Sequence, residues 1–544
     1  MKLDKLWIED FKNLKDVEID FDQDELVTVV IGWNGAGKSN VIEALVIIFR
    51  NLDLGDLTKF SYRLEYLCHG KRIRINADKE QKTADKQYQI EYCGAEKIED
   101  KQVWNTLRFS RLNNKSEDKF LPSNVFGYYS GPSDRLATHF YEHQRKFRDQ
   151  LLYPKKHKLD EKTLPLRPLF YAQKVHSNFV LLSFFLGQDK KVQEFLKEKL
   201  NILGLESVLF VLNKPDWSSK EGDPRFWNAT GVVRPFLDRL FSASLAPMKQ
   251  KIKVPHPMKN PETVEALFLY LKDIESLREV GNETSDKDFF KLLESIYFSN
   301  LIHEVRIRVQ IKDEEGKEDT LTFRELSEGE QQLLAVLGLL RFTREDESLF
   351  LLDEPDTHLN PAWSMEYINY LHVVAGLDEH VGQKKNSHIV LATHDPIVIS
   401  TMKKEQIQIM KRDDNSLKVV ANPPLYDPKG LGVSGILTSD MFGLRSDLDS
   451  ETLNDLDEHA VLLSKGTLLP REAQRLKELQ ENMQQAGFLD AYSDPYFSAF
   501  VKAWSRKHGG NLFRNTFLSD MDRDQLNDMT DEILAELDDE EASS

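Results

Sequence analysis

Gly32-Trp33-Asn34-Gly35-Ala36-Gly37-Lys38-Ser39 is a complete G-x-x-x-x-G-K-S phosphate-binding loop. It follows Leu26–Ile31, a run of mostly β-branched residues that is typical of a buried parallel strand. The next ten residues, Asn40–Phe49, carry apolar side chains on nearly all sides and predict a buried helix. Strand, glycine-rich loop and helix form the context in which this motif binds phosphate, so the sequence predicts a P-loop nucleotide-binding fold of the α/β class.

The residue types of this loop suit a nucleoside triphosphate. Backbone N–H groups around a tight loop can cradle phosphate, and the glycines permit that close approach. We expect Lys38 to place a positive charge at the β- and γ-phosphates, Ser39 to ligate Mg²⁺, and Asn34 to face the γ-phosphate. The predicted nucleotide-binding residues of this half of the site are Gly32, Asn34, Gly35, Ala36, Gly37, Lys38 and Ser39.

Two adjacent acids follow a second buried strand far downstream. The apolar run Leu349–Leu352 ends at Asp353-Glu354, which places both acids at the carboxyl edge of a parallel sheet, where ligands bind. A carboxylate at this edge can hold Mg²⁺, which we assign to Asp353, and we expect Glu354 to polarise the attacking water. Because adjacent strand residues point in opposite directions, the two acids should have different roles.

A third strand, His388–Thr393, is followed directly by His394. A single histidine is more often structural than catalytic. At this position, after a buried strand, His394 fits a sensor of the γ-phosphate, and we treat it as a catalytic candidate together with Glu354.

The segment Leu326-Ser327-Glu328-Gly329-Glu330-Gln331-Gln332 opens a predicted helix over Glu330–Leu340. A serine hydroxyl and the free amides of a helix start form an anion site. The chain already has its own phosphate loop, so the target of Ser327 and Gly329 would be the γ-phosphate of a second subunit in a homodimer or higher oligomer. The alternative is that the segment only caps a helix.

Composition limits the class of protein. The 544 residues are 40% apolar and 30% charged, which suits a soluble protein of about two to four domains. We found neither a membrane-length apolar run nor a signal peptide, and Cys68 and Cys93 are too few for a disulfide framework, so we expect a cytoplasmic protein with no membrane partner. A net charge of -18 argues against a chain that coats nucleic acid indiscriminately.

The pattern along the chain predicts four regions. Residues 1–136 and 303–423 would form the two parts of an ATPase head, and 137–302 a helical insertion lobe. Residues 424–544 would form a mainly helical, partner-binding region that ends in an acidic tail at 520–541. Long heptad arrays are absent, so the insertion is not a coiled-coil arm.

Residues 1–50 and 320–400 together resemble the ABC-type ATPase heads of the SMC, RecF and OLD-like group. Within this group, the stretch Asp353–Pro361 looks like the pattern of prokaryotic defence ATPases. Three further segments, at 128–131, 430–438 and 441–446, make the chain similar to the PtuA family, the ATPases of Septu-type antiphage defence systems, including those associated with retrons.

This resemblance implies a slow, Mg²⁺-dependent ATPase that controls a small HNH nuclease (PtuB-like), joined in retron versions by a reverse transcriptase and its msDNA. We found no nuclease motif in the chain, and the region after 424 lacks the strand-and-acid pattern of a Toprim domain. The family's glutamine loop is matched only by Gln144. The alternative function is a RecF/SMC-like DNA-repair ATPase that acts directly on DNA. The long insertion argues against a transporter ATPase.

Overall fold

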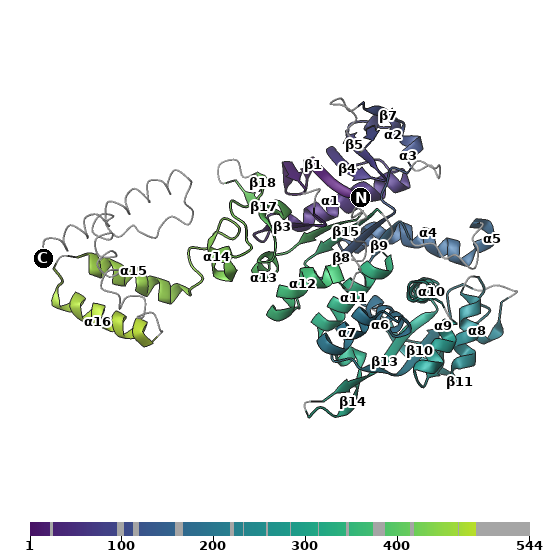
Figure 1. Cartoon of the computed structure of the whole chain (residues 1–544). Helices are drawn as coiled ribbons and strands as arrows, with labels where there is room; N and C mark the ends of the chain where they lie inside the picture. Colours follow the sequence, from purple (N-terminus) through teal and green to yellow (C-terminus); the bar gives the residue numbers. More distant parts are fainter. Residues whose placement is uncertain are drawn as a thin grey trace. The chain divides into compact units, whose positions relative to one another are not determined.

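The computed structural model describes residues 1–21, 25–94, 103–112, 119–157, 167–217, 222–231, 233–256, 259–282, 284–313, 315–343, 347–373, 387–413, 418–465 and 467–485. The chain divides into two compact units, Met1–Pro423 and Pro424–Ser544 (Figure 1), and each is considered by itself below. The predicted acidic tail at 520–541 lies outside the described residues.

A seven-stranded sheet with the order β18-β17-β3-β16-β15-β8-β9 forms the centre of the first unit. All neighbouring strands are parallel except β17 and β18. Every residue of β3, β15 and β16 is buried, as expected for parallel strands that are covered on both faces. The strands are β3 (Val27–Gly32), β8 (Asn124–Tyr129), β9 (Leu169–Tyr171), β15 (Ser348–Asp353), β16 (His388–Ala392), β17 (Ile407–Arg412) and β18 (Val419–Asn422).

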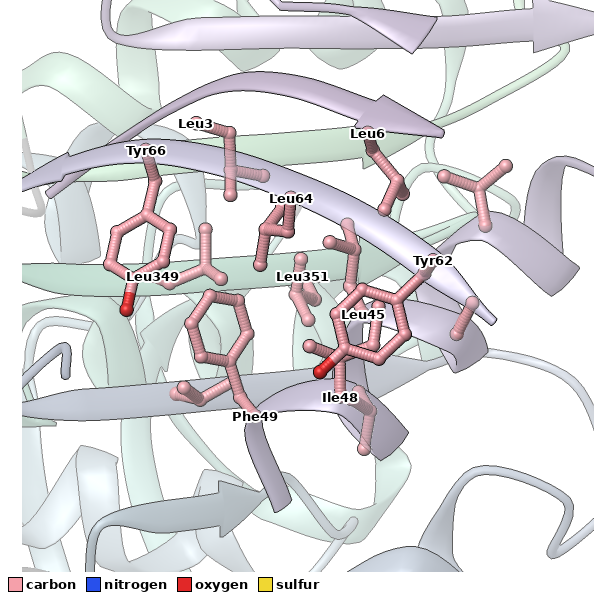
Figure 2. Packing of buried hydrophobic residues seen from close by; sticks show 14 of the residues in the cluster. Leu3, Leu6, Leu45, Ile48, Phe49, Tyr62, Leu64, Tyr66, Leu349 and Leu351 are labelled. Carbon is pink, nitrogen blue, oxygen red and sulfur yellow. The ribbon is translucent and has the colours of Figure 1, made fainter. Parts of the chain in front are cut away.

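The helix that follows the phosphate loop, α1 (Lys38–Leu54), lies between this sheet and a second, six-stranded antiparallel sheet. Figure 2 shows Leu45, Ile48 and Phe49 of α1 packed with side chains of β1, β4 and β15. Full burial of each such side chain stabilises the fold by roughly 1.5–3 kcal/mol. The second sheet has the order β2-β1-β4-β5-β6-β7 and comprises β1 (Lys2–Phe11), β2 (Leu14–Asp20), β4 (Tyr62–Cys68), β5 (Lys71–Ala77), β6 (Tyr88–Gly94) and β7 (Asn105–Leu107).

The predicted helical lobe contains a sheet as well as helices. Five antiparallel strands with the order β11-β12-β10-β13-β14 pair here. β13 and β14 belong to this sheet, whereas the sequence pattern assigns residues 303–423 to the ATPase head. β9 lies within 137–302 but extends the parallel sheet. The lobe strands are β10 (Gly204–Asn213), β11 (Leu245–His256), β12 (Lys259–Leu271), β13 (Ile302–Lys312) and β14 (Glu318–Thr322).

Helices join the lobe to the ATPase sheet. α6 (His176–Leu186) packs against both α10 (Asp286–Phe298) and α11 (Glu328–Thr343), and α11 is buried over most of its length. A Cβ at Gly338 of α11 would lie 2.0 Å from Cγ1 of Val180 on α6. α6 and α11 can therefore approach this closely because position 338 is a glycine. The other helices of this unit are α2 (Ala84–Gln87), α3 (Phe109–Leu112), α4 (Tyr141–Leu152), α5 (Pro154–His157), α7 (Lys190–Lys199), α8 (Arg234–Ala243), α9 (Ile274–Gly281), α12 (Pro361–Val373) and α13 (Pro396–Ile399).

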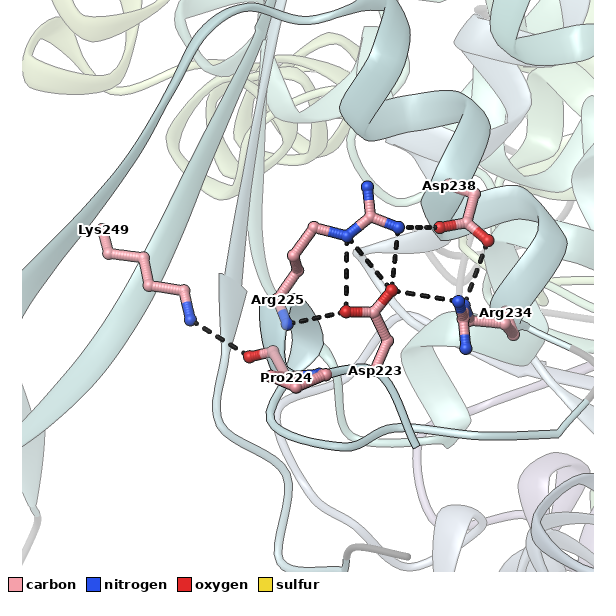
Figure 3. Close-up of polar contacts among 6 residues, drawn as sticks. All are labelled: Asp223, Pro224, Arg225, Arg234, Asp238 and Lys249. Atoms are coloured by element: carbon pink, nitrogen blue, oxygen red, sulfur yellow. Dashed lines mark hydrogen bonds and ion pairs between the residues drawn. The ribbon is translucent and has the colours of Figure 1, made fainter. Parts of the chain in front are cut away.

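An ion-pair network fixes one turn of the lobe (Figure 3). Asp223 accepts hydrogen bonds from the Arg225 guanidinium and pairs with Arg234 on α8 at 3.0 Å. Both arginines also form ion pairs with Asp238, which lies on α8 one turn after Arg234. The hydrogen bonds from Arg225 lower the pKa of Asp223. The turn is therefore attached to α8 by paired charges.

We expect Glu294→Gln to destabilise the protein by about 3 kcal/mol, because Arg167 and Glu294 form an ion pair in which both side chains are only 1% exposed. The Arg167 guanidinium also lies over the rings of Phe170 and Phe298, at 4.5 and 4.2 Å, and the substitution leaves its charge without a counterion. Denaturant unfolding of the two proteins measures the difference. Replacing both partners with apolar residues should recover much of the loss, and a Glu294→Gln protein as stable as the parent would contradict the prediction.

The described part of the second unit is helical, in agreement with the predicted mainly helical C-terminal region. It contains α14 (Gly432–Thr438), α15 (Ser450–Ser464) and α16 (Pro470–Gln485). Arg475 on α16 pairs with Asp455 and Glu458 on α15, which holds these two helices together. Across the described parts of the whole chain, every helix is too short or too polar to cross a membrane.

Candidate nucleotide site

The phosphate loop connects β3 to α1 through backbone that only glycine adopts easily. Gly32, Gly35 and Gly37 all have positive φ, at 146°, 84° and 104°. A Cβ at Gly32 would lie 2.3 Å from the Met410 carbonyl oxygen of the neighbouring β17. Both the backbone conformation and the close neighbour therefore require glycine at position 32.

Two asparagines that the sequence analysis did not single out hold this loop from outside. Asn13 donates from Nδ2 to the Gly35 carbonyl at 2.8 Å and accepts from Asn40 Nδ2 at 2.6 Å. Asn13 lies between β1 and β2, so the antiparallel sheet helps to fix the loop. Asn13 belongs to no motif, so nothing in the sequence indicated its contact with the phosphate loop.

Lys38 is buried and donates from Nζ to the Gly32 carbonyl at 2.8 Å, so its amine lies inside the curve of the loop. Burial lowers the pKa of Lys38, while the negative charges of Glu354 and Asp353 act in the opposite direction. An ammonium group at this place can exchange its carbonyl partner for phosphate oxygens.

The structure brings the two distant half-motifs together at Ser39 and Asp353. Ser39 Oγ donates to Asp353 Oδ1 at 2.9 Å, although the residues are far apart in the sequence. Hydroxyl and carboxylate oxygens are ligands that Mg²⁺ prefers, so this pair has the chemistry needed to hold the ion between itself and the phosphates. Mg²⁺ bound there would neutralise charge on the β- and γ-phosphates.

Asp353 should make Mg²⁺ binding sensitive to acid. Burial raises the pKa of Asp353 from 3.8 to about 6, so below that pH the carboxyl is increasingly protonated and protons compete with the metal. We expect the Mg²⁺ concentration for half-maximal ATP hydrolysis to be constant above pH 7 and to rise by up to about tenfold per unit below pH 6.

Titrations of the hydrolysis rate with Mg²⁺ at several pH values test this expectation. Saturating Mg²⁺ should restore most of the rate at low pH, which separates proton competition from acid unfolding. A half-maximal Mg²⁺ concentration that stays the same from pH 5 to pH 8 would contradict the assignment of Asp353 as a metal ligand.

Glu354 and His394 face each other across the ends of β15 and β16. His394 Nδ1 lies 3.2 Å from Glu354 Oε1. Their hydrogen bond lowers the pKa of Glu354 and raises that of His394. Glu354 has a left-handed backbone (φ 52°), which is uncommon for a residue with a side chain and directs its carboxylate differently from that of Asp353. Glu354 is thus kept ionised, as a base that polarises water must be.

The segment before α11 shows the helix cap that we considered as an alternative. Ser327 Oγ accepts from the Glu330 amide at 3.2 Å, and Glu330 Oε2 accepts from the Ser327 amide at 2.7 Å, which is a capping box. Ser327 is nevertheless exposed, so the cap does not prevent a role toward a second subunit. A Cβ at Gly329 would lie 2.3 Å from the His358 carbonyl oxygen, which explains glycine at that position.

A charged cluster beside the loop was not found by the sequence analysis. Glu43 on α1 accepts hydrogen bonds from Lys12, Arg135 and His139. Burial alone would raise the pKa of Glu43, but the hydrogen bonds from His139 and Lys12 and the nearby positive charges lower it to about 2. Arg135 also donates to Asn40 Oδ1 at 3.0 Å, so the segment after β8 is attached to the helix that follows the phosphate loop.

The candidate for the glutamine loop, Gln144, lies within α4. Gln173 instead lies two residues after the end of β9 and accepts a hydrogen bond from Tyr297 on α10 at 3.1 Å. It connects the edge of the parallel sheet to the lobe.

Comparison with known families agrees with this geometry. Residues 1–164 match the family described as "AAA ATPase domain", and residues 229–400 match "AAA domain, putative AbiEii toxin, Type IV TA system". The first match contains the phosphate loop, and the second contains Ser327, Asp353 and His394. The chain is a P-loop ATPase. The fold class and the ATPase activity predicted from the sequence are thereby confirmed.

Two curated proteins are similar to this ATPase, as the resemblance to the PtuA family predicted. "Septu protein PtuA" of Bacillus mycoides (strain KBAB4) is 25% identical over 240 residues, which are 41% of this chain and 31% of that protein. "Retron Vc95 probable ATPase" of Vibrio cholerae serotype O1 biovar El Tor is 23% identical over 436 residues, 75% of this chain and 73% of that protein. The match to PtuA therefore spans about a third of that relative.

Two solved structures also align with 78% of the ATPase at 15% identity. One is the "SmcHead bound to the C-winged helix domain of ScpA", with a TM-score of 0.32 and 98% of that chain covered. The other is an Smc head domain with an extended coiled coil, bound to the C-terminal domain of ScpA derived from Pyrococcus furiosus, with a TM-score of 0.30 and 96% covered. These scores are too low to support the fold, which rests on the strand order described above.

Proposed function

We propose that this ATPase is the regulatory subunit of an antiviral defence complex, and that it dimerises around ATP and controls a partner HNH nuclease. The observation that carries the proposal is the split site. One half of the site consists of the catalytic residues Ser39, Asp353 and Glu354 of one chain. The other half is the exposed start of α11 at Ser327, which lies on a separate element and can bind the γ-phosphate held by another copy.

The relatives support the biological setting. One is named for the Septu system and the other for a retron, and the match to the retron ATPase covers about three quarters of each chain. We include an HNH nuclease as partner, and in retron versions a reverse transcriptase and msDNA, because the resemblance to these ATPases implies them. We assign the binding of such partners to the second unit, Pro424–Ser544.

The dimer can be tested with Glu354→Gln, which should hold ATP without hydrolysing it. We expect sedimentation velocity to show a monomer without nucleotide and a dimer, or a higher oligomer, with ATP and Mg²⁺. A protein that stays monomeric at saturating ATP would exclude the split-site dimer. Ser327→Glu should prevent dimerisation without changing ATP binding to the monomer, since the added negative charge would face the partner's phosphate.

The defence role can be tested in cells that carry this gene with its neighbouring open reading frames. We expect an adjacent HNH gene and protection against phage that is lost both with Lys38→Ala and with an inactivated nuclease. Protection that survives removal of the nuclease gene would overturn control of a partner nuclease. Sensitivity to DNA damage without any effect on phage would favour the RecF-like repair function instead.

A further inference from the structure

The tip of the phosphate loop presents a large aromatic side chain to solvent. Trp33 is 61% exposed, and its neighbours Asn34 and Gly35 are exposed as well. The Ala36 amide donates to the Trp33 carbonyl at 3.0 Å, which closes the turn and fixes the backbone that carries the indole. Tryptophan is among the residues most enriched in the energetically dominant contacts of protein interfaces.

A cavity of about 360 Å³ opens beside the start of α11. Its walls come from the ends of β8 and β9, the first turns of α11, and His358. Four tyrosine rings, of Tyr128, Tyr129, Tyr141 and Tyr171, line it together with polar groups of Asp134 and Gln331. Pockets that take up small molecules have volumes of about 300–1,000 Å³, and an indole is small enough to enter this one.

In the ATP dimer proposed above, these two features would lie opposite each other. If Ser327 of one copy reaches the γ-phosphate held by another, it approaches the phosphate loop whose exposed tip is Trp33. Glu328, the next residue after Ser327, is part of the cavity wall. A two-fold axis would then repeat the same contact at the second site of the dimer.

We propose that Trp33 of each copy inserts its indole into this cavity of the other copy when the dimer closes around ATP; the proposal rests on the dimer described under the proposed function. The tyrosine rings can pack on the indole edge-to-face or offset, and the carboxylate of Asp134 or Glu328 can accept its N–H. The occupant is a second copy of this chain, because the phosphate loop that carries Trp33 binds nucleotide at the same closing surface.

Cysteine cross-linking tests the contact directly. The chain has two cysteines, Cys68 and Cys93, and both are buried, so introduced cysteines can be modified selectively. We would combine Glu354→Gln with Trp33→Cys and Lys174→Cys, because Lys174 lies at the cavity and is 74% exposed. A short bis-maleimide should give a covalent dimer with ATP and Mg²⁺ and none without nucleotide. A matched pair, Trp33→Cys with a cysteine in place of the exposed Lys86 on α2 (Lys86→Cys), should give none in either condition.

A second measurement uses the side chain itself. In the Glu354→Gln background, Trp33→Ala should raise the dimer dissociation constant about 30-fold, and Trp33→Phe should raise it less, when the variants are compared at equal ATP occupancy. A Trp33→Ala dimer as tight as its parent, or cross-linking that is equal for both cysteine pairs, would overturn the insertion. If the Glu354→Gln parent itself never dimerises, the proposed ATP dimer fails, and the insertion fails with it.

Discussion

Replacing Glu354 with Gln is expected to lower the rate of ATP hydrolysis about 10²- to 10³-fold while ATP binding is retained. Glu354 lies at the end of β15, next to Asp353, and its hydrogen bond with His394 lowers its pKa, so it is an ionised carboxylate at neutral pH. The amide of Gln occupies the same space but cannot accept a proton from the attacking water. Single-turnover hydrolysis of radiolabelled ATP measures the chemical step separately from product release.

The matched control is Glu366→Gln on α12, where the carboxylate is exposed and bonds only to Asn369 among the described contacts. This variant should hydrolyse ATP within about twofold of the parent, as expected for a surface substitution away from special features. A Glu354→Gln protein that keeps more than a tenth of the parent rate would exclude Glu354 as the group that activates water.

The Glu354–His394 pair also has a defined pH window. Its stabilising effect requires ionised Glu354 and protonated His394. It is therefore lost as pH falls through the lowered pKa of Glu354 and as pH rises through the raised pKa of His394. His394 is 54% exposed, so solvent screens the pair and its contribution to stability is small. The pair matters for the ionisation of the base more than for the stability of the fold.

The central sheet could be predicted because its signals are local. β3, β15 and β16 are mostly apolar, and each ends at, or two residues before, a residue with evident chemistry. The lobe sheet could not be found in this way. β10 pairs with β13, so Gly204 lies opposite Gln310, and no local pattern indicates a pairing between such distant segments. β11 is rich in lysine and polar residues, and it gave no clear strand signal.

The residues of the nucleotide site also divide into those that a local sequence motif indicates and those that only the folded structure reveals. Gly32, Lys38 and Asp353 belong to motifs whose spacing indicates their chemistry, and the structure places Asp353 next to Ser39. Asn13 and Arg135 are single polar residues in loops, and only the folded chain shows that they attach to the phosphate loop and to α1. Residues of this kind need a structure because their partners are distant in the sequence.

Replacing Lys38 with Ala is expected to weaken ATP binding about 10³-fold, so that no binding is detected at micromolar nucleotide. Lys38 is the buried positive charge within the loop, and its amine already lies inside the ring of backbone groups that would hold phosphate. Removing one partner of a buried charge pair costs about 2–5 kcal/mol, and the middle of that range corresponds to a loss of two to three orders of magnitude. Calorimetric titration with Mg²⁺-ATP measures the change.

Lys12 provides the matched control, since it is a nearby lysine that pairs with Glu43 rather than facing the loop and is 44% exposed. Lys12→Ala should change ATP affinity by less than about threefold, because Lys12 does not face the loop and Glu43 keeps its hydrogen bonds with Arg135 and His139. Equal losses in both variants would mean that positive charge around α1, and not the position of Lys38, governs binding. An unchanged ATP affinity in Lys38→Ala would show that the phosphate loop is not part of the nucleotide site. The proposed dimer that closes around ATP would then lose its basis.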